Sequence, residues 1–314
     1  MFAYRSRIPE LPLRALIPLL LLGMAAFFRA PGGAADADRR GQGMIFRDFA
    51  QTIGALSGGT LSAWMPLLSW LSAGLALWLF DLNLRLVSPG ARAQSRSFYS
   101  VIFFCLAPIF FRSGWSLNPD MPVLALLLGF VWLTGKAMEN LHFRHVAGAA
   151  AGGLVLMVVQ PILWPAALCM VIGLGWTLGR AGRPGVLSAF LALVVAAGGG
   201  FIWFLGSGTS DWAAAAQWSD WTPANWFARH TAEGAAGVRP NALFVLFLLF
   251  HPAFCILMPA LLLLWKRTDW RRPLRQWLLT ALAAYLLFLS GLPGQKLRDL
   301  LPAYGLLLLL LFQS

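Results

Sequence analysis

Charged residues are scarce in this sequence of 314 residues: they make up 11 % of it, whereas apolar residues make up 59 %. Soluble domains carry about a quarter charged residues, and one soluble core of this size does not hide so much apolar surface. The mean hydropathy is +0.71. The composition therefore excludes an ordinary soluble domain and favours an integral membrane protein.

Cysteines and nucleotide-binding signatures are also scarce or missing. The three cysteines, Cys105, Cys169 and Cys255, lie in apolar segments, and their spacing supports neither a disulfide framework nor a metal site. We interpret them as small buried apolar residues. The sequence has no Walker loop, no dinucleotide-binding glycine fingerprint and no repeat of fixed period. No soluble nucleotide-binding domain is therefore predicted.

Long apolar runs separated by short polar gaps dominate the sequence. A helix needs about 20 apolar residues to cross a bilayer, and its backbone groups must bond within the segment. The predicted membrane segments include residues 15–28, 61–80, 97–111, 121–133, 187–205, 243–265, 277–289 and 300–312. One contains Gly198-Gly199-Gly200, a pattern typical of close helix packing. The runs predict an all-α polytopic transmembrane helical bundle of about ten segments, forming one integral membrane domain over 1–314.

The apolar run 146–178 is interrupted by Gln160-Pro161 and Trp164-Pro165 and has basic residues at both ends. Proline ends or kinks a helix, and the backbone groups that it frees need protein or water partners. We interpret the run as two short helices that meet near the outer face. A single interrupted segment is the alternative.

The formal net charge of +12 comes from basic residues in the gaps between apolar runs. A soluble protein with this charge would be a candidate for binding nucleic acid, but here the pattern is that of cytoplasmic loops enriched in arginine and lysine. Arg5, Arg7 and Arg14 precede the first run, and the gap 266–275 is the most basic. This predicts both termini in the cytoplasm. The predicted outer loops are residues 30–60, 113–120, 207–240 and 291–299.

The outer loops carry polar groups suited to chemistry. The loop 207–240 also holds four tryptophans, which suit an interfacial helix at the headgroups. Acids of the first two loops and bases of the last could face one cavity, where a carboxylate activates an acceptor and cations hold a phosphate leaving group. Contact with water or headgroups is the ordinary explanation for each residue alone, and for Asp120 it is an N-terminal helix cap. The candidates are Asp38, Asp48, Asp120, Arg229, His230, Lys296 and Arg298.

Four passages add a further pattern through their order and spacing. They are residues 42–50 with 64–68, residues 107–120, residues 147–161 and residues 291–302. In these passages the chain resembles the GT-C glycosyltransferases, polytopic enzymes that use a polyprenyl-phosphate sugar. The catalytic aspartate of that family would align with Gln42, and its basic residue in the third passage is replaced around Gln160-Pro161.

The resemblance implies transfer of a sugar from a polyprenyl-phosphate carrier to an acceptor at the outer face of a bacterial inner membrane. The base would be Asp38, with Asp48 second, while Asp120 and Gln42 orient the acceptor or a metal. Arg298 and Lys296 would bind the lipid phosphate, and Arg229 and His230 are further cavity candidates. A divalent cation is left open and no other cofactor is predicted. The expected partners are the carrier-linked sugar, membrane lipids and subunits of a membrane complex, not nucleic acid.

Two alternatives stay open. Gln42 cannot act as a carboxylate base, which favours a non-catalytic GT-C-like subunit or a lipid-binding scaffold. A transporter is the third hypothesis, but ion coupling usually leaves ionisable groups in the middle of the membrane, and the spans hold few. His251 is the main candidate inside a span, and His251-Pro252 more readily marks a helix kink.

Overall fold

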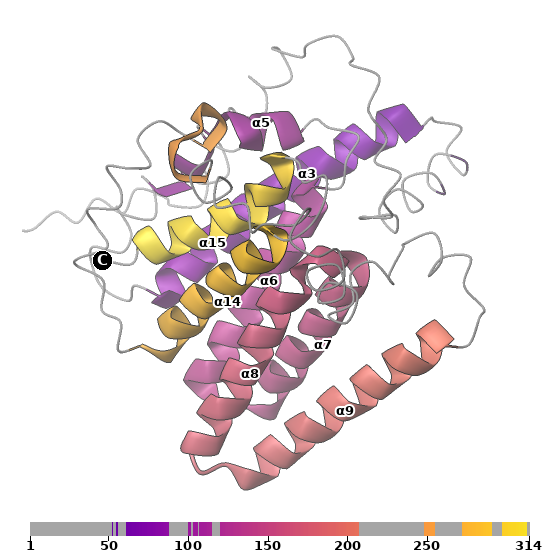
Figure 1. Cartoon of the computed structure of the whole chain (residues 1–314), viewed down its shortest axis with the longest axis vertical. Coiled ribbons are helices and arrows are strands. Elements are labelled where there is room, and N and C mark those ends of the chain that lie inside the picture. Colours follow the sequence, from indigo (N-terminus) through magenta and orange to yellow (C-terminus); the bar gives the residue numbers. More distant parts are fainter. Residues whose placement is uncertain are drawn as a thin grey trace, which may run out of the picture.

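The structure is a computed structural model of the chain, and it describes residues 52, 55, 61–87, 100–101, 103–105, 107–114, 120–206, 248–254, 272–290 and 297–312. Within these ranges the regular elements are all helical and no strand occurs. The longer helices, shown in Figure 1, are α3 (Leu61–Val87), α5 (Pro108–Gly114), α6 (Asp120–Asn140), α7 (Phe143–Val159), α8 (Trp164–Arg180), α9 (Pro184–Gly206), α14 (Pro273–Ser290) and α15 (Leu301–Leu311).

Helices α3 and α6 run parallel to each other. A Cβ atom at Gly129 would lie 3.6 Å from Leu79, and one at Gly135 would meet Leu86, so later residues of one helix face later residues of the other. Leu274, at the start of α14, also approaches Gly135, at 2.9 Å from the same virtual Cβ atom. The end of α6 therefore meets the start of α14. These directions agree with the alternation predicted from the loop charges.

The predicted interruption of the run 146–178 is confirmed. Helix α7 ends at Val159, a short 3-10 turn η1 (Pro161–Leu163) follows, and α8 begins at Trp164. Gly153 of α7 faces Val171 of α8, so the two helices pack side by side and antiparallel. Each has 17 residues, about 26 Å of helix, which is close to the thickness of the hydrocarbon core.

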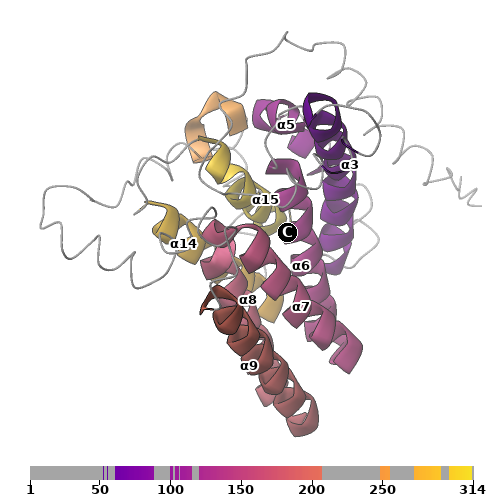
Figure 2. The same cartoon turned by 90° about the vertical axis from the view of Figure 1, so that its right-hand side faces the viewer.

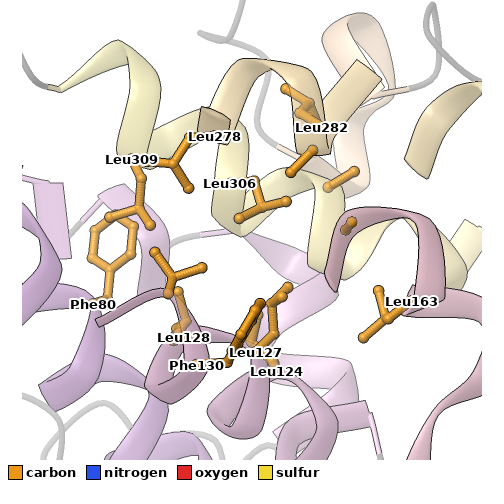
Figure 3. Close-up of a cluster of buried hydrophobic side chains, with 14 of the residues drawn as sticks. Phe80, Leu124, Leu127, Leu128, Phe130, Leu163, Leu278, Leu282, Leu306 and Leu309 are labelled. Carbon is orange, nitrogen blue, oxygen red and sulfur yellow. The ribbon is translucent and has the colours of Figure 1, made fainter. Parts of the chain in front are cut away.

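Helix α15 lies at the centre of the bundle, and Figure 2 shows it between α3 and α14. All eleven residues from Leu301 to Leu311 are buried, as expected of a helix that is apolar on every side. Gly305 allows a close approach to α6, because a Cβ atom there would lie 3.2 Å from Leu124 Cδ1. Figure 3 shows the leucine-rich core that α3, α6, α14, α15 and the turn η1 build together.

The outward faces of the helices are apolar. On α3, Leu71 and Trp78 are 56 % and 59 % exposed, and on α8 the exposed stripe consists of Leu168, Ile172 and Trp176. By length and composition, Leu67–Leu86 and Asp120–Asn140 each suffice to cross a membrane. An apolar core surrounded by apolar outer faces is what a lipid environment requires.

Helix α3 continues beyond the predicted end of its span at Phe80. Its polar residues find partners there: Arg85 forms an ion pair with Asp81 at 2.8 Å, and the side-chain N–H2 of buried Asn83 donates to the Leu79 carbonyl at 2.8 Å. The same amide donates to the Leu128 carbonyl of α6 at 2.9 Å. Partnered polar groups can remain in a membrane helix, which explains the longer helix.

The predicted outer turn 113–120 needs correction. Ser113 is buried within α5, and Asp120 is the first residue of α6, so the turn is shorter at both ends. Likewise, the predicted loop 291–299 ends inside a 3-10 turn, η5 (Leu297–Leu300). Short helical turns satisfy backbone groups locally, so they replace loop at these boundaries.

Two further predictions have different outcomes. The predicted interruption at His251-Pro252 is confirmed, because His251 is not helical, the 3-10 turn η3 (Pro252–Phe254) follows it, and His251 Nδ1 accepts from the Ala253 N–H at 3.1 Å. The described residues do not provide the close packing predicted at Gly198 and Gly199, because none of their atoms lies within 4 Å of a virtual Cβ atom at either. Helix α9 leans away from the bundle, as Figure 1 shows.

Basic residues gather at one end of the bundle, here called the basic end. The helix directions bring together the end of α3, the end of α6, the start of α7, the end of α8 and the starts of α9 and α14. The residues concerned are Arg85, Lys136, Arg144, Arg180, Arg183, Arg272 and Arg275. The opposite end, here called the carboxylate end, holds Asp120 and Asp299.

Candidate functional site

The candidate site lies at the carboxylate end. Asp120 opens α6 there, and Asp299 lies in η5, the turn that leads into α15. The break between α7 and α8 and the last turn of α14 reach the same end, because α7 and α14 run opposite to α6. Elements distant in the sequence therefore surround one polar region.

Tyr285 of α14 joins the elements of this site. Its side chain is fully buried, and its O–H donates to the backbone carbonyl of Asp299 at 2.5 Å. The carboxylates of Asp299 and Asp120 both interact electrostatically with the Tyr285 hydroxyl. Tyr285 thus links α14 to the turn η5, at the end of the bundle where α6 begins with Asp120.

The turn η5 presents Arg298 at this end. Leu300 is completely buried, and Leu297 packs against the core, so the turn is anchored on both sides of Arg298. The bond from Tyr285 fixes the carbonyl of the next residue, Asp299. Arg298 itself is half-buried. An arginine held in this way can donate two parallel hydrogen bonds to the oxygens of a phosphate.

The break between α7 and α8 reaches the same end of the bundle, where η1 and α8 contact α14. Gln160 is the C-terminal cap of α7 and is 8 % exposed. The Trp164 ring meets Phe288 edge-on, with 5.3 Å between ring centroids, and Phe288 is three residues after Tyr285. Within the described part of the chain, the buried Trp164 indole N–H has no hydrogen-bond partner. This break therefore carries an amide and an indole where the family resemblance predicts a basic residue.

An aromatic cluster supports the start of α15. Phe104 lies with its ring centroid 4.7 Å from that of Phe80, 5.1 Å from Phe110 and 5.5 Å from Tyr304. Tyr304 also meets Phe254 at 5.6 Å. Packed aromatic pairs of this kind stabilise by about 0.5–1.5 kcal/mol beyond their buried area. The cluster fixes the end of α15 that carries η5 and Arg298.

The structure places two of the predicted site residues, Asp120 and Arg298, at this end. The others lie outside the described residues, and their roles stay predictions: Asp38, Gln42, Asp48, Arg229, His230 and Lys296. The described ranges contain no cluster of three or more potential metal ligands of the His, Cys, Asp or Glu type. The divalent cation therefore also stays a prediction.

Tyr285 and the carbonyl of Asp299 were not predicted as parts of the site. A signal for Tyr285 was present, since a hydroxyl within an apolar run needs a hydrogen-bond partner. The chain has four tyrosines, and this one stands in the predicted span 277–289. Its partner, however, lies beyond the end of that span and cannot be read from local spacing.

Comparison with known proteins supports the architecture. No family model matches the chain, and no curated protein matches its sequence. Among solved structures, the chain is similar to the crystal structure of ArnT from Cupriavidus metallidurans bound to undecaprenyl phosphate, with a TM-score of 0.66 and 12 % sequence identity. The likeness covers 98 % of this chain and 60 % of the other, so the chain spans less than two thirds of that protein's length. The chain has the GT-C-like fold, an all-α polytopic bundle of transmembrane helices.

Proposed function

We propose that the chain transfers a sugar from a polyprenyl-phosphate carrier to an acceptor at the outer face of a bacterial inner membrane. The observation that carries the proposal is the likeness of nearly the whole chain to a protein whose crystal structure holds undecaprenyl phosphate. Arg298, in the anchored turn η5 at the end of the bundle where α6 begins, is the cation that such a lipid phosphate requires.

The sorting of charges supports the orientation. Cytoplasmic loops carry an excess of arginine and lysine, so the basic end faces the cytoplasm and the carboxylate end faces outward. Both termini are then cytoplasmic. Cysteines introduced at Thr222 and Thr268 should react with an impermeant thiol reagent from opposite sides of the membrane. Reaction of both from the same side would contradict this orientation.

The proposed reaction needs a base and a cation in separate roles. A carboxylate takes the proton of the acceptor hydroxyl, the oxygen attacks the anomeric carbon, and the bond from that carbon to the phosphate oxygen breaks. The phosphate leaves with its electron pair, and Arg298, assisted by Lys296, stabilises the negative charge. Asp120 and Gln42 are the candidates for orienting the acceptor or a metal, and Arg229 and His230 are further cavity candidates.

The proposed base is a carboxylate of the first outer loop. Asp38 is the first choice and Asp48 the second, because neighbouring arginines would keep either acid ionised. Asp38→Asn should abolish transfer while binding of the carrier survives, and Asp48→Asn should have the smaller effect. Transfer at the wild-type rate in both variants and in the double variant would exclude a base in this loop.

The phosphate role of Arg298 is tested separately from the chemistry. Arg298→Ala should weaken binding of the carrier by about ten- to a hundredfold, since hydrogen bonds to charged groups contribute about 1.5–3 kcal/mol each. Arg144→Ala, a change of the same charge at the basic end, is the matched control and should leave this binding unchanged.

A second candidate function is a non-catalytic, lipid-binding subunit of the same fold. The observation that favours it is Gln42, which stands where the family resemblance expects the catalytic aspartate. A wild-type chain that binds the carrier but transfers no sugar, together with a Gln42→Asp variant that does transfer, would establish this alternative.

A further inference from the structure

The turn between α8 and α9 holds two arginines at the basic end, opposite to the candidate site. Arg180 is the last residue of α8, and Arg183 directly precedes α9. Gly182 between them has a left-handed backbone φ of 63°, which glycine adopts without strain, and its N–H donates to the Gly179 carbonyl at 3.3 Å. The turn is therefore short and closed, and it keeps the two arginines close together.

Both arginines are exposed, and neither forms an ion pair within the described part of the chain. Lys136, at the same end, is different, because its ammonium group is 3.1 Å from the Glu139 carboxylate. The turn thus presents two positive charges that the described residues do not neutralise.

An apolar ridge leads along α8 to this turn. Leu168, Ile172 and Trp176 follow one another at intervals of four residues and are 41 %, 53 % and 58 % exposed. Arg180 continues the same ridge, and its guanidinium carbon lies 5.0 Å from the centroid of the Trp176 ring. The arginine is therefore held over an aromatic ring at the polar end of an apolar strip.

The dimensions of the ridge match one leaflet of a bilayer. Leu168 and Arg180 are 12 residues apart, which corresponds to about 18 Å along a helix that rises about 1.5 Å per residue. One leaflet contributes about half of the roughly 30 Å of hydrocarbon. A molecule with an anionic head at Arg180 and an acyl chain toward Leu168 would fit this surface along its whole length.

We infer that the α8 ridge and the α8–α9 turn form a binding site for an anionic phospholipid of the leaflet at the basic end. The phosphate accepts hydrogen bonds from the guanidinium groups of Arg180 and Arg183, and one acyl chain lies against Leu168, Ile172 and Trp176. The site is separate from the carrier site, which lies at the other end of the bundle. Its occupant is a structural lipid that anchors α8 and the start of α9 in the membrane.

The test uses the full-length chain in detergent and measures lipid binding by native mass spectrometry. Phosphatidylglycerol and phosphatidylcholine with identical acyl chains are the two probes, and inorganic phosphate is the competitor. Phosphatidylglycerol should bind more tightly than phosphatidylcholine, and millimolar phosphate should not displace it. Arg180→Gln and Arg183→Gln should each weaken it about fivefold, as expected for one basic residue at an anionic membrane surface.

Two controls keep the inference open to refutation. Lys136→Gln removes the same charge at the same end but from a paired lysine, so it should leave lipid binding unchanged. Equal binding of the two lipids, or an equal loss in Lys136→Gln, would overturn the inference and show attraction by overall charge alone. Displacement by inorganic phosphate would also overturn it, because the site would then bind a free anion instead of a lipid.

Discussion

Replacement of Tyr285 by phenylalanine tests how the candidate site is held together. The change removes one hydroxyl and retains the ring that is buried in α14. The Asp299 carbonyl then loses its 2.5 Å hydrogen bond. A buried hydrogen bond contributes about 1 kcal/mol net, and a carbonyl left without a partner costs about 1–3 kcal/mol. Because Asp299 is only half-buried, water can reach the turn, so the lower figure of about 1 kcal/mol applies.

The loss of this hydrogen bond should raise the hydrogen-exchange rates of the turn η5 more than those of the other elements. A loss of about 1 kcal/mol corresponds to roughly fivefold faster hydrogen exchange of the backbone amides of residues 297–300, and to carrier binding weakened by up to about fivefold. Ser290→Ala is the matched control, because the Ser290 hydroxyl donates to the Leu287 carbonyl of its own helix at 2.7 Å. A folded Tyr285→Phe variant with unchanged exchange in η5 would refute the view that Tyr285 holds the turn.

Two packing predictions follow from the helix contacts. Gly173→Ala should destabilise the fold by about 1–3 kcal/mol, because the added methyl group would overlap the Trp277 ring. Gly179→Ala is the control and should be neutral, because its methyl group would lie 3.9 Å from the nearest side chain. Thermal unfolding of the two variants in detergent measures the difference. Asn83→Leu should lower the free energy of unfolding by about 0.6–1.7 kcal/mol, because it removes the hydrogen bond from α3 to the Leu128 carbonyl of α6. A variant that unfolds in a mixed micelle at the wild-type melting temperature would contradict this.

The helices of the described regions could largely be predicted from the sequence, because the rules that produce them are local. Apolar runs of sufficient length gave α6, α9 and α14, and the two Xaa-Pro pairs after Val159 gave the break between α7 and α8. The end of α3 could not be predicted in the same way. Whether Asn83 ends a helix depends on the partner that it finds, and this partner is a carbonyl of α6.

The candidate site was predicted only in part, for the same physical reason. Asp120 and Arg298 could be chosen because charged residues at the ends of apolar runs stand out. The turn that carries Arg298 is held by Tyr285, which looks like an ordinary residue of an apolar helix until its hydroxyl meets the carbonyl of Asp299. The prediction at Gly198 and Gly199 fails among the described residues for a similar reason, because small residues allow close packing but do not provide the neighbouring helix.

The central claim is that a lipid phosphate binds at the carboxylate end, beside Arg298. A density map of the full-length chain in a lipid nanodisc with added undecaprenyl phosphate tests this most directly. The account predicts phosphate density within hydrogen-bonding distance of the Arg298 guanidinium, near Asp120 and η5, at the end of the bundle opposite to Arg180 and Arg183. Phosphate density of the added lipid at the α8–α9 turn, with none beside Arg298, would contradict it.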